Sequence, residues 1–239
     1  VELQEGHVHH VVIEFASKES VTLSFSALQA GLGKPLGDAD ITAAVTAAKG
    51  AETAIIFAGR NGEWDTEGAD LPHIKLPGRQ DELIAKVAAA NPNTIVVLQT
   101  GGPVEMPWID AVPGVLHAWY PGQAAGSAIA DVLFGDAEPG GRLPQTFPVK
   151  WADNPSHSQD PEVYPGHNGK VRYEEGLFIG YSHYDKTGIA PLFPFGHGLS
   201  YTSFSWSNLR LEADGENVIV SLYVTNTGNR TGQEVVQIY

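Results

Sequence analysis

The sequence predicts an α/β fold, in which a mostly parallel sheet is sandwiched by helices and flanked by partial all-β segments. Between residues 37 and 135, alanine-rich stretches with helical spacing alternate with short apolar strands, an order typical of a parallel sheet covered on both faces. In 7–27 and after residue 200, apolar residues recur at every second position, which indicates strands with one buried face. Between them, 139–198 is weakly periodic and rich in Gly, Pro and aromatic residues. We expect that stretch to be a long ordered excursion over the α/β region.

The α/β elements follow from capping residues and apolar runs. In chain order we expect a helix capped by Asp38 that ends at Gly50, a strand at 53–58, a helix at 79–90, and then strands at 94–98 and 115–119 and a helix at 123–134. In such sheets, ligands bind beyond the carboxyl ends of the strands. The loops after these strands are therefore the first place to look for chemistry.

The β segments at the two ends are expected to be incomplete. A two-stranded hairpin such as the one predicted at 7–27 is marginal alone, so we expect it to belong to a sheet whose other strands are absent. After residue 200, the expected features are one apolar face made by Val218, Val220, Leu222 and Val224, a turn at 226–229 and a strand at 235–239.

Composition excludes several classes of function. The 239 residues carry a formal net charge of −14, so no basic stripe is available for nucleic acid or an anionic membrane, and neither is an expected partner. The chain has no cysteine, which excludes disulfides, thiolate metal sites and cysteine nucleophiles. No apolar run approaches the roughly 20 residues of a membrane-spanning helix. The first residues lack a signal-peptide pattern and an initiator methionine, so we expect the chain to begin inside a longer protein.

The loop after the first α/β strand, residues 59–70, carries the most chemistry. It holds four carboxylates within eight residues, namely Glu63, Asp65, Glu67 and Asp70. A carboxyl kept protonated near neutral pH can donate a proton to a leaving oxygen, whereas acidic loops are also common on solvated surfaces. Trp64 offers an apolar face to a sugar ring or anchors the loop, and the sequence leaves both readings open.

Three other sequence patterns are weaker evidence for a functional site than this loop. The glycine run at 31–37 has the wrong spacing for a dinucleotide-binding loop and contains Pro35, so a domain linker is the favoured interpretation. His7, His9 and His10 lack a third ligand on one face, and neither a metal nor an organic cofactor is expected. Asn229 begins a glycosylation sequon, which matters only in a secretory pathway.

Six motifs occur in a fixed order along the chain. They are NGEWDTEG at 61–68, AWYPGQ at 118–123, AIADVLFGD at 128–136, PGGRLP at 139–144, YEEGLFIGY at 173–181 and FPFGHGLSY at 193–201. Each is weak alone, but together they are specific, and the chain resembles the carboxyl-terminal part of glycoside hydrolase family 3 β-glucosidases.

The resemblance implies a division into three parts. Residues 1–30 would end an inserted lectin-like β-sandwich, 31–200 would form the family's carboxyl-terminal α/β sandwich domain, and 201–239 would begin a truncated fibronectin type III-like domain. The family's amino-terminal barrel, which supplies an aspartate nucleophile, is missing from this chain.

The resemblance also implies that a glutamate in the 59–70 loop is the general acid/base. Aligning the family's Glu-Gly-aromatic-Asp pattern selects Glu67, with Ala69 in place of the aromatic residue, and Glu67 is our preferred assignment. Aligning Gly-Glu nearest the strand selects Glu63 instead. Trp64 and Asp70 are implied as substrate contacts, although Leu71 stands where relatives carry a basic residue.

The implied activity is retaining hydrolysis of terminal β-D-glucosyl residues in β-glucosides or cello-oligosaccharides by the full-length protein. A single carboxylate cannot complete a double displacement, so the isolated chain is predicted to be inactive. The alternatives are a β-xylosidase or related β-glycosidase of the same family, a non-catalytic carbohydrate-binding or scaffold module, and a dinucleotide enzyme. Secretion is an expectation from the family.

Overall fold

The computed structural model describes residues 36–67, 70–158 and 160–239. The chain divides into two compact units, Val1–Leu36 and Gly37–Tyr239, and the description below concerns the second. The predicted hairpin at 7–27 and the glycine run up to residue 35 lie outside the described residues.

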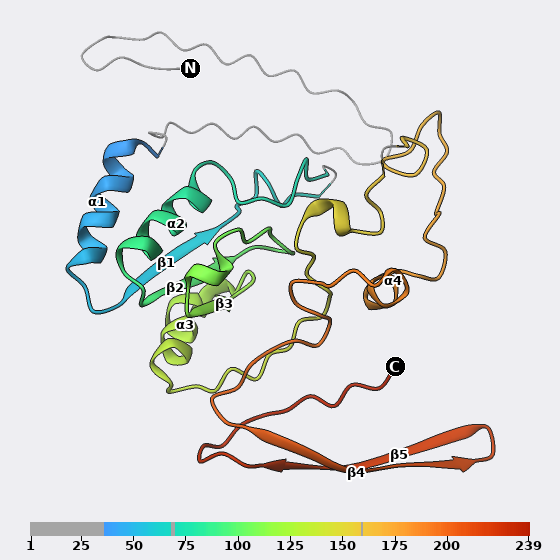
Figure 1. Ribbon diagram of the computed structural model, residues 1–239. Helices are drawn as coiled ribbons and strands as arrows, with labels where there is room; N and C mark the ends of the chain where they lie inside the picture. The colour runs from blue at the N-terminus through green and yellow to red at the C-terminus, as the bar shows by residue number, and fades with distance from the viewer. Residues whose placement is uncertain (1–35, 68–69, 159) are drawn as a thin grey trace. The chain divides into compact units, whose positions relative to one another are not determined.

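A three-stranded parallel sheet forms the centre of the α/β region (Figure 1). Its strands are β1 (Ala54–Gly59), β2 (Thr94–Gln99) and β3 (Gly114–His117), in the spatial order β1-β2-β3. Both pairings are parallel, so all three carboxyl ends meet at one edge of the sheet. The predicted α/β class is confirmed, with each strand within two residues of its expected bounds.

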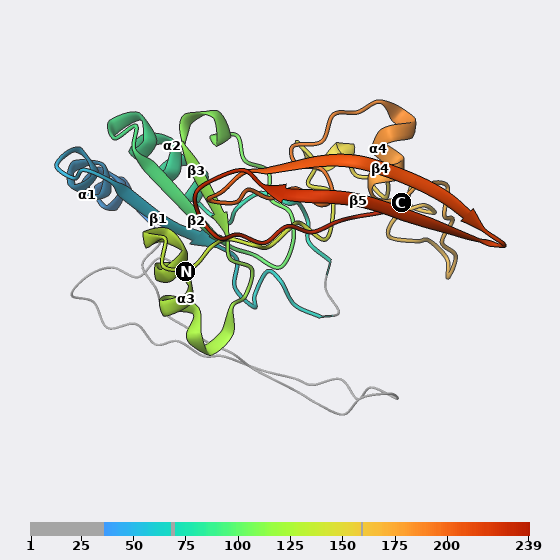
Figure 2. The same cartoon turned by 90° about the horizontal axis from the view of Figure 1, so that it is seen from below.

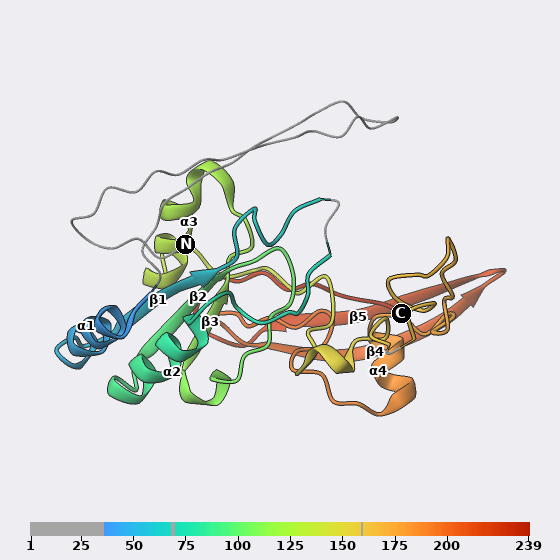
Figure 3. The same ribbon diagram turned by 90° about the horizontal axis from the view of Figure 1, so that it is seen from above.

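Helices lie on both sides of this sheet (Figure 3). The helices α1 (Asp38–Lys49) and α2 (Gln80–Ala90) pack against each other on one side, and α3 (Ala125–Phe134) lies on the other. Short 3₁₀ turns occur at η1 (Ile109–Ala111), η2 (Gly122–Ala124) and η3 (Trp151–Asp153).

The predicted cap of the first helix is wrong by one residue. Gly37 is the N-cap, and its N–H donates to the Asp40 carboxylate at 2.9 Å. Asp38 instead lies in the first turn, where its negative charge still favours the positive end of the helix dipole. The physical reason is that Asp40, at the third helical position, can reach back to the backbone of the cap.

The 139–198 excursion contributes to the core as expected for an ordered segment. Phe147 is 1% exposed, and its N–H and carbonyl pair with the backbone of Phe193 and Leu192 at 2.8 and 2.9 Å. A short helix, α4 (Tyr181–Thr187), lies within the same segment. The core residues are Ala58, Leu76, Ile84, Val96, Leu98, Val104, Met106, Trp108 and Phe147.

After the excursion the chain forms a long antiparallel hairpin (Figure 2). Its strands are β4 (Phe204–Asp214) and β5 (Asn217–Asn226), with an irregularity between Ser207 and Arg210. The strand predicted at 235–239 is wrong, because those residues form no ladder with any described strand. Tyr239 packs its ring against Tyr181 instead, at 4.7 Å between centroids.

Candidate active site

The loop after β1 folds into a compact turn. The Asn61 carbonyl accepts the N–H groups of Trp64 and Asp65, each at 3.0 Å, and its side-chain oxygen accepts the N–H of Glu63 at 3.1 Å. Asn61 thus satisfies three consecutive backbone donors, the role for which short polar side chains are favoured in turns. The course of residues 61–65 is fixed by these bonds.

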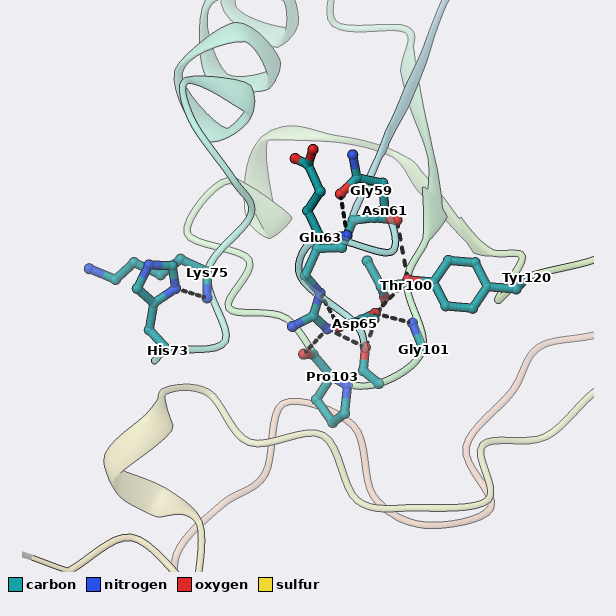
Figure 4. A network of polar contacts seen from close by, with 12 residues as sticks. Gly59, Asn61, Glu63, Asp65, His73, Lys75, Thr100, Gly101, Pro103 and Tyr120 are labelled. Carbon is teal, nitrogen blue, oxygen red and sulfur yellow. Dashed lines mark hydrogen bonds and ion pairs between the residues drawn. The ribbon is translucent and has the colours of Figure 1, made fainter. Parts of the chain in front are cut away.

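The carboxylate of Asp65 joins the ends of all three parallel strands (Figure 4). One of its oxygens accepts the Gly101 N–H at 2.8 Å and the Tyr120 hydroxyl, and the other lies 3.4 Å from the Arg60 Nε. Arg60 directly follows β1, Gly101 follows β2 and Tyr120 follows β3. The edge of the sheet where ligands bind in this class of fold is therefore organised around one side chain.

Arg60 is a fully buried cation at this edge. Its side chain has no exposed surface, and one guanidinium nitrogen donates to the carbonyls of Gly102 and Pro103 at 3.3 and 3.0 Å. Burial lowers the pKa of Arg60, while the nearby Asp65 and Tyr120 act in the opposite direction. Because an unpaired buried charge is strongly unfavourable, Asp65 is needed as its counter-ion.

Gly101 and Tyr120 allow the close approach that this network requires. A Cβ at Gly101 would lie 3.1 Å from the Tyr120 ring and 3.2 Å from the Asp65 carboxylate, so only glycine fits without a shift. Burial and the hydrogen bond to Asp65 raise the pKa of Tyr120 to about 12. Tyr120 therefore remains a hydroxyl donor at neutral pH.

Beside this network lies a pocket of about 480 Å³, a volume suited to a small ligand. It is lined by residues of the 60–74 loop, of 101–103 and of the excursion. The members are Arg60, Trp64, Asp65, Thr66, Asp70, Leu71, Ile74, Gly101, Gly102, Pro103, Trp151, Asn154, Ser156, His157 and Tyr164.

The structure brings Trp64 and Asp70 together on this pocket. Trp64 is half-buried, and its ring lies 5.4 Å from that of His73, so it both lines the pocket and anchors the loop. Burial and the nearby Asp70 carboxylate raise the pKa of Tyr164.

Neither candidate glutamate, Glu63 or Glu67, is among the residues that line the pocket. Both side chains are exposed; Glu63 directly precedes Trp64 and Glu67 directly follows Thr66, and these two neighbours do line the pocket. The Glu63 carboxylate points away from Asp65 (Figure 4). The choice of Glu67 over Glu63 as the acid/base therefore stays a prediction from the family's motif.

Several residues of the site carry no clear signal in the sequence. The indole N–H of Trp151 donates to the His157 ring. The backbone N–H of Trp151 donates to the Glu105 carboxylate at 2.8 Å. Because the 139–198 segment is weakly periodic, sequence patterns did not indicate that Trp151, His157 or Tyr164 would reach the 60–74 loop. Tyr120, by contrast, lies inside a recognised motif directly after a predicted strand, and that position could have identified it.

Other predicted features lie apart from the pocket. Asn229 is exposed in the turn after β5, and its glycosylation stays a prediction. Within the part of the chain that the structure describes, no three His, Cys, Asp or Glu side chains gather as metal ligands. The same residues include no helix long and apolar enough to cross a membrane.

The chain is similar in sequence to proteins of a known family. Residues 5–181 match the model of the glycosyl hydrolase family 3 C-terminal domain. A β-glucosidase of Rhizobium radiobacter is 54% identical over the whole chain, which corresponds to 30% of that protein. Thermostable β-glucosidase B of Acetivibrio thermocellus is 48% identical over 83% of the chain and 26% of its own length.

Solved structures agree in fold. A β-glucosidase from Streptomyces venezuelae in complex with D-glucose is 48% identical and superposes with a TM-score of 0.76, over 82% of this chain and 25% of that one. A β-glucosidase from Kluyveromyces marxianus in complex with glucose is 40% identical, with a TM-score of 0.75 over 81% of this chain and 23% of its own. The chain thus spans about a third or less of the relatives it matches. With its parallel sheet and carboxylate-bearing loop, the chain belongs to glycoside hydrolase family 3, and its residues 5–181 correspond to the C-terminal domain of that family.

Proposed function

We propose that the full-length protein is a retaining β-glucosidase that removes terminal β-D-glucosyl residues, and that Glu67 is its general acid/base. The observation that carries the proposal is the carboxylate-bearing 59–70 loop beside a pocket at the carboxyl edge of the sheet. Within that loop, Glu67 is chosen because it fits the family's Glu-Gly-aromatic-Asp pattern. The β-glucosidase names of the similar proteins and the glucose bound in two of the similar structures support the same activity.

The proposed reaction needs a second carboxylate from outside this chain. An aspartate on a barrel domain of the same polypeptide attacks the anomeric carbon, and the bond to the leaving oxygen breaks as Glu67 transfers its proton to that oxygen. In the second step the Glu67 carboxylate takes a proton from water, the water oxygen bonds the anomeric carbon, and the aspartate is released. Retention by this route requires the two carboxyls to lie about 5–5.5 Å apart.

The pocket suggests what else touches the substrate. Trp64 and Asp70 both line the pocket, and an aromatic ring together with a carboxylate suits a sugar with its apolar faces and hydroxyl rim. We propose both as contacts for the glucosyl unit or for the next sugar of a cello-oligosaccharide. Leu71 lines the same pocket and offers no charge to the substrate.

The assignment of Glu67 is tested by comparing Glu67→Gln with Glu63→Gln in the full-length protein. Each variant is assayed on two aryl β-glucosides, one with a good and one with a poor leaving group. A general acid contributes about 10²–10⁴-fold to the rate, and a poor leaving group depends on it far more. Glu67→Gln is therefore expected to lose the poor substrate selectively, while Glu63→Gln retains the activity on both.

Three results would change the proposal. Leaving-group selectivity in Glu63→Gln would move the acid/base role to that residue. If neither variant affected turnover, the loop would be structural and the chain a non-catalytic module. A preference of the full-length protein for aryl β-xylosides would keep the mechanism and replace the sugar.

A further inference from the structure

We infer that Asp65 is the positioning residue of this site: its carboxylate fixes the acid/base loop to the ends of β2 and β3, and so sets where the Glu67 carboxyl delivers its proton. The inference rests on the proposed function, because it assigns a role to Asp65 through Glu67. Asp65 is not itself a catalytic residue in this account.

Asp65 is the last residue before Glu67 that hydrogen bonds hold in place. The turn closed by Asn61 ends with the Asp65 N–H. In 36–67 and the other described ranges, Thr66 and Glu67 make no hydrogen bond or ion pair of their own. Two residues span at most about 7 Å, so the position of Asp65 limits the space in which the Glu67 carboxyl can lie.

The contacts of Asp65 come from elements far apart in the sequence. Gly101 and Tyr120 are 36 and 55 residues from Asp65, and both follow strands of the rigid sheet. Hydrogen bonds to an ionised carboxylate are about twice as strong as neutral ones, and the Asp65 side chain is only 14% exposed. The loop is therefore held to the sheet by short, shielded, charge-assisted bonds.

The same contacts argue against Asp65 as the proton donor. One of its oxygens accepts a backbone N–H and a tyrosine hydroxyl, and the other forms an ion pair with the Arg60 guanidinium at 3.4 Å. A protonated Asp65 would lose at least one of these bonds. Glu67 carries no such partners among the described residues and can change its protonation state without breaking the network.

The experiment uses the full-length protein with three variants. Asp65→Asn keeps the shape of the side chain but removes its charge, Tyr120→Phe removes one donor and leaves the Arg60 pair intact, and Glu67→Gln removes the acid. Asp110→Asn is the control, because Asp110 is an exposed carboxylate in η1 outside the pocket. For each variant we would measure kcat/KM on the good and poor aryl β-glucosides, the pH–rate profile and the melting temperature.

Misplacement of a catalytic group by about 1 Å costs roughly 100-fold in rate. We therefore expect Asp65→Asn and Tyr120→Phe to lose about 10–100-fold in kcat/KM on the poor substrate and less on the good one. Both should keep the basic limb of the pH–rate profile, since they retain the Glu67 carboxyl, whereas Glu67→Gln should lose that limb. If Asp65→Asn does not fold, Tyr120→Phe still tests the positioning role, because it removes one of the bonds that hold Asp65.

The outcomes separate this inference from the proposed function. If Glu67→Gln is selective for the poor substrate but folded Asp65→Asn and Tyr120→Phe match Asp110→Asn, the positioning role is refuted and the function survives. If Asp65→Asn itself loses the basic limb, Asp65 is the titrating acid and the inference is overturned. If Glu67→Gln is not selective, the proposed acid/base fails, and the inference fails with it.

Discussion

The central strand of the parallel sheet, β2, is mostly buried, whereas the β4–β5 hairpin is mostly exposed. In β2, Val96, Val97 and Leu98 have no exposed surface. In β4, every residue after Phe204 is exposed, and Leu211 retains 66% of its surface. Both regions are strands in the structure, so an apolar pattern predicts a strand without predicting that its apolar face is buried.

The register of the hairpin shows that its apolar face is nevertheless continuous. Residues directly opposite each other in an antiparallel pair share a face, and Leu211 lies opposite Val220 while Trp206 lies opposite Val224. The face comprises Phe204, Trp206, Leu211, Ala213, Val218, Val220, Leu222 and Val224. It includes all four apolar residues of the face predicted from the sequence. A hairpin with one such face needs further strands to be stable on its own.

The largest expected effect comes from shortening a side chain in the buried strand β2. Leu98→Ala should lower the free energy of unfolding of the 239-residue chain by about 3 kcal/mol, because it opens a cavity in a fully buried strand. Leu211→Ala should change it by less than about 0.5 kcal/mol, since the side chain is mostly exposed. Urea unfolding measures both. Equal losses would mean that the hairpin face is covered in solution.

Sequence reasoning succeeded where periodicity carries the information and failed where long-range contacts decide. The strands β1 to β3 were predictable because continuous apolar runs such as 94–98 read as buried strands. The strand expected at 235–239 was wrong because a strand requires a partner, and alternation of Val235, Gln237 and Tyr239 cannot supply one.

The candidate site shows the same division. The 59–70 loop was predictable from its carboxylates and from its position after a strand. The contact of Asp65 with Gly101 and Tyr120 was not, because nothing in residues 59–70 indicates which distant loop they meet. The lining by Trp151 and Tyr164 was missed for the same reason.

A second difference between the two regions is a partly buried histidine in the sheet. His117 ends β3, and burial lowers its pKa to about 4, with Arg60 acting in the same direction. Thr100 donates its hydroxyl to the Gly102 carbonyl at 2.8 Å and lies 3.1 Å from the His117 Nε2, so we assign the proton of the neutral ring to Nε2. The other ring nitrogen is buried without a partner among the described residues, and protonation would place an unpaired charge there.

Acidification should therefore weaken the α/β region. The folded pKa of His117 lies below the unfolded value of about 6.5, so its contribution to stability is present above that value and is lost as pH falls toward 4. Between pH 7 and pH 5 the loss is about 2 kcal/mol. Unfolding of the parent and of His117→Gln at both pH values checks this. The variant should lose about 2 kcal/mol less than the parent, whereas His167→Gln, at an exposed site, should behave like the parent. An unchanged pH response in His117→Gln would contradict the assignment.

The smallest expected effect lies at the polar contacts that tie the two regions together. Arg142, in the excursion, contacts Glu234, beyond the hairpin, with Nε and Nη2 at 3.2 and 3.1 Å from one carboxylate oxygen. Their side chains are only 7% and 18% exposed, so salt screens this pair less than a surface pair. Glu234→Gln keeps an acceptor oxygen but removes the charge, which should cost about 1 kcal/mol.

Glu212→Gln is the matched control, because Glu212 is an exposed carboxylate on β4 and should change stability by less than about 0.5 kcal/mol. Urea unfolding at low and high salt distinguishes the two variants. If Glu234→Gln costs no more than Glu212→Gln at either salt concentration, the charge of this pair does not hold the hairpin to the α/β region. Attachment would then rest on neutral contacts such as the Tyr201 hydroxyl, which donates to the Val132 carbonyl at 2.7 Å.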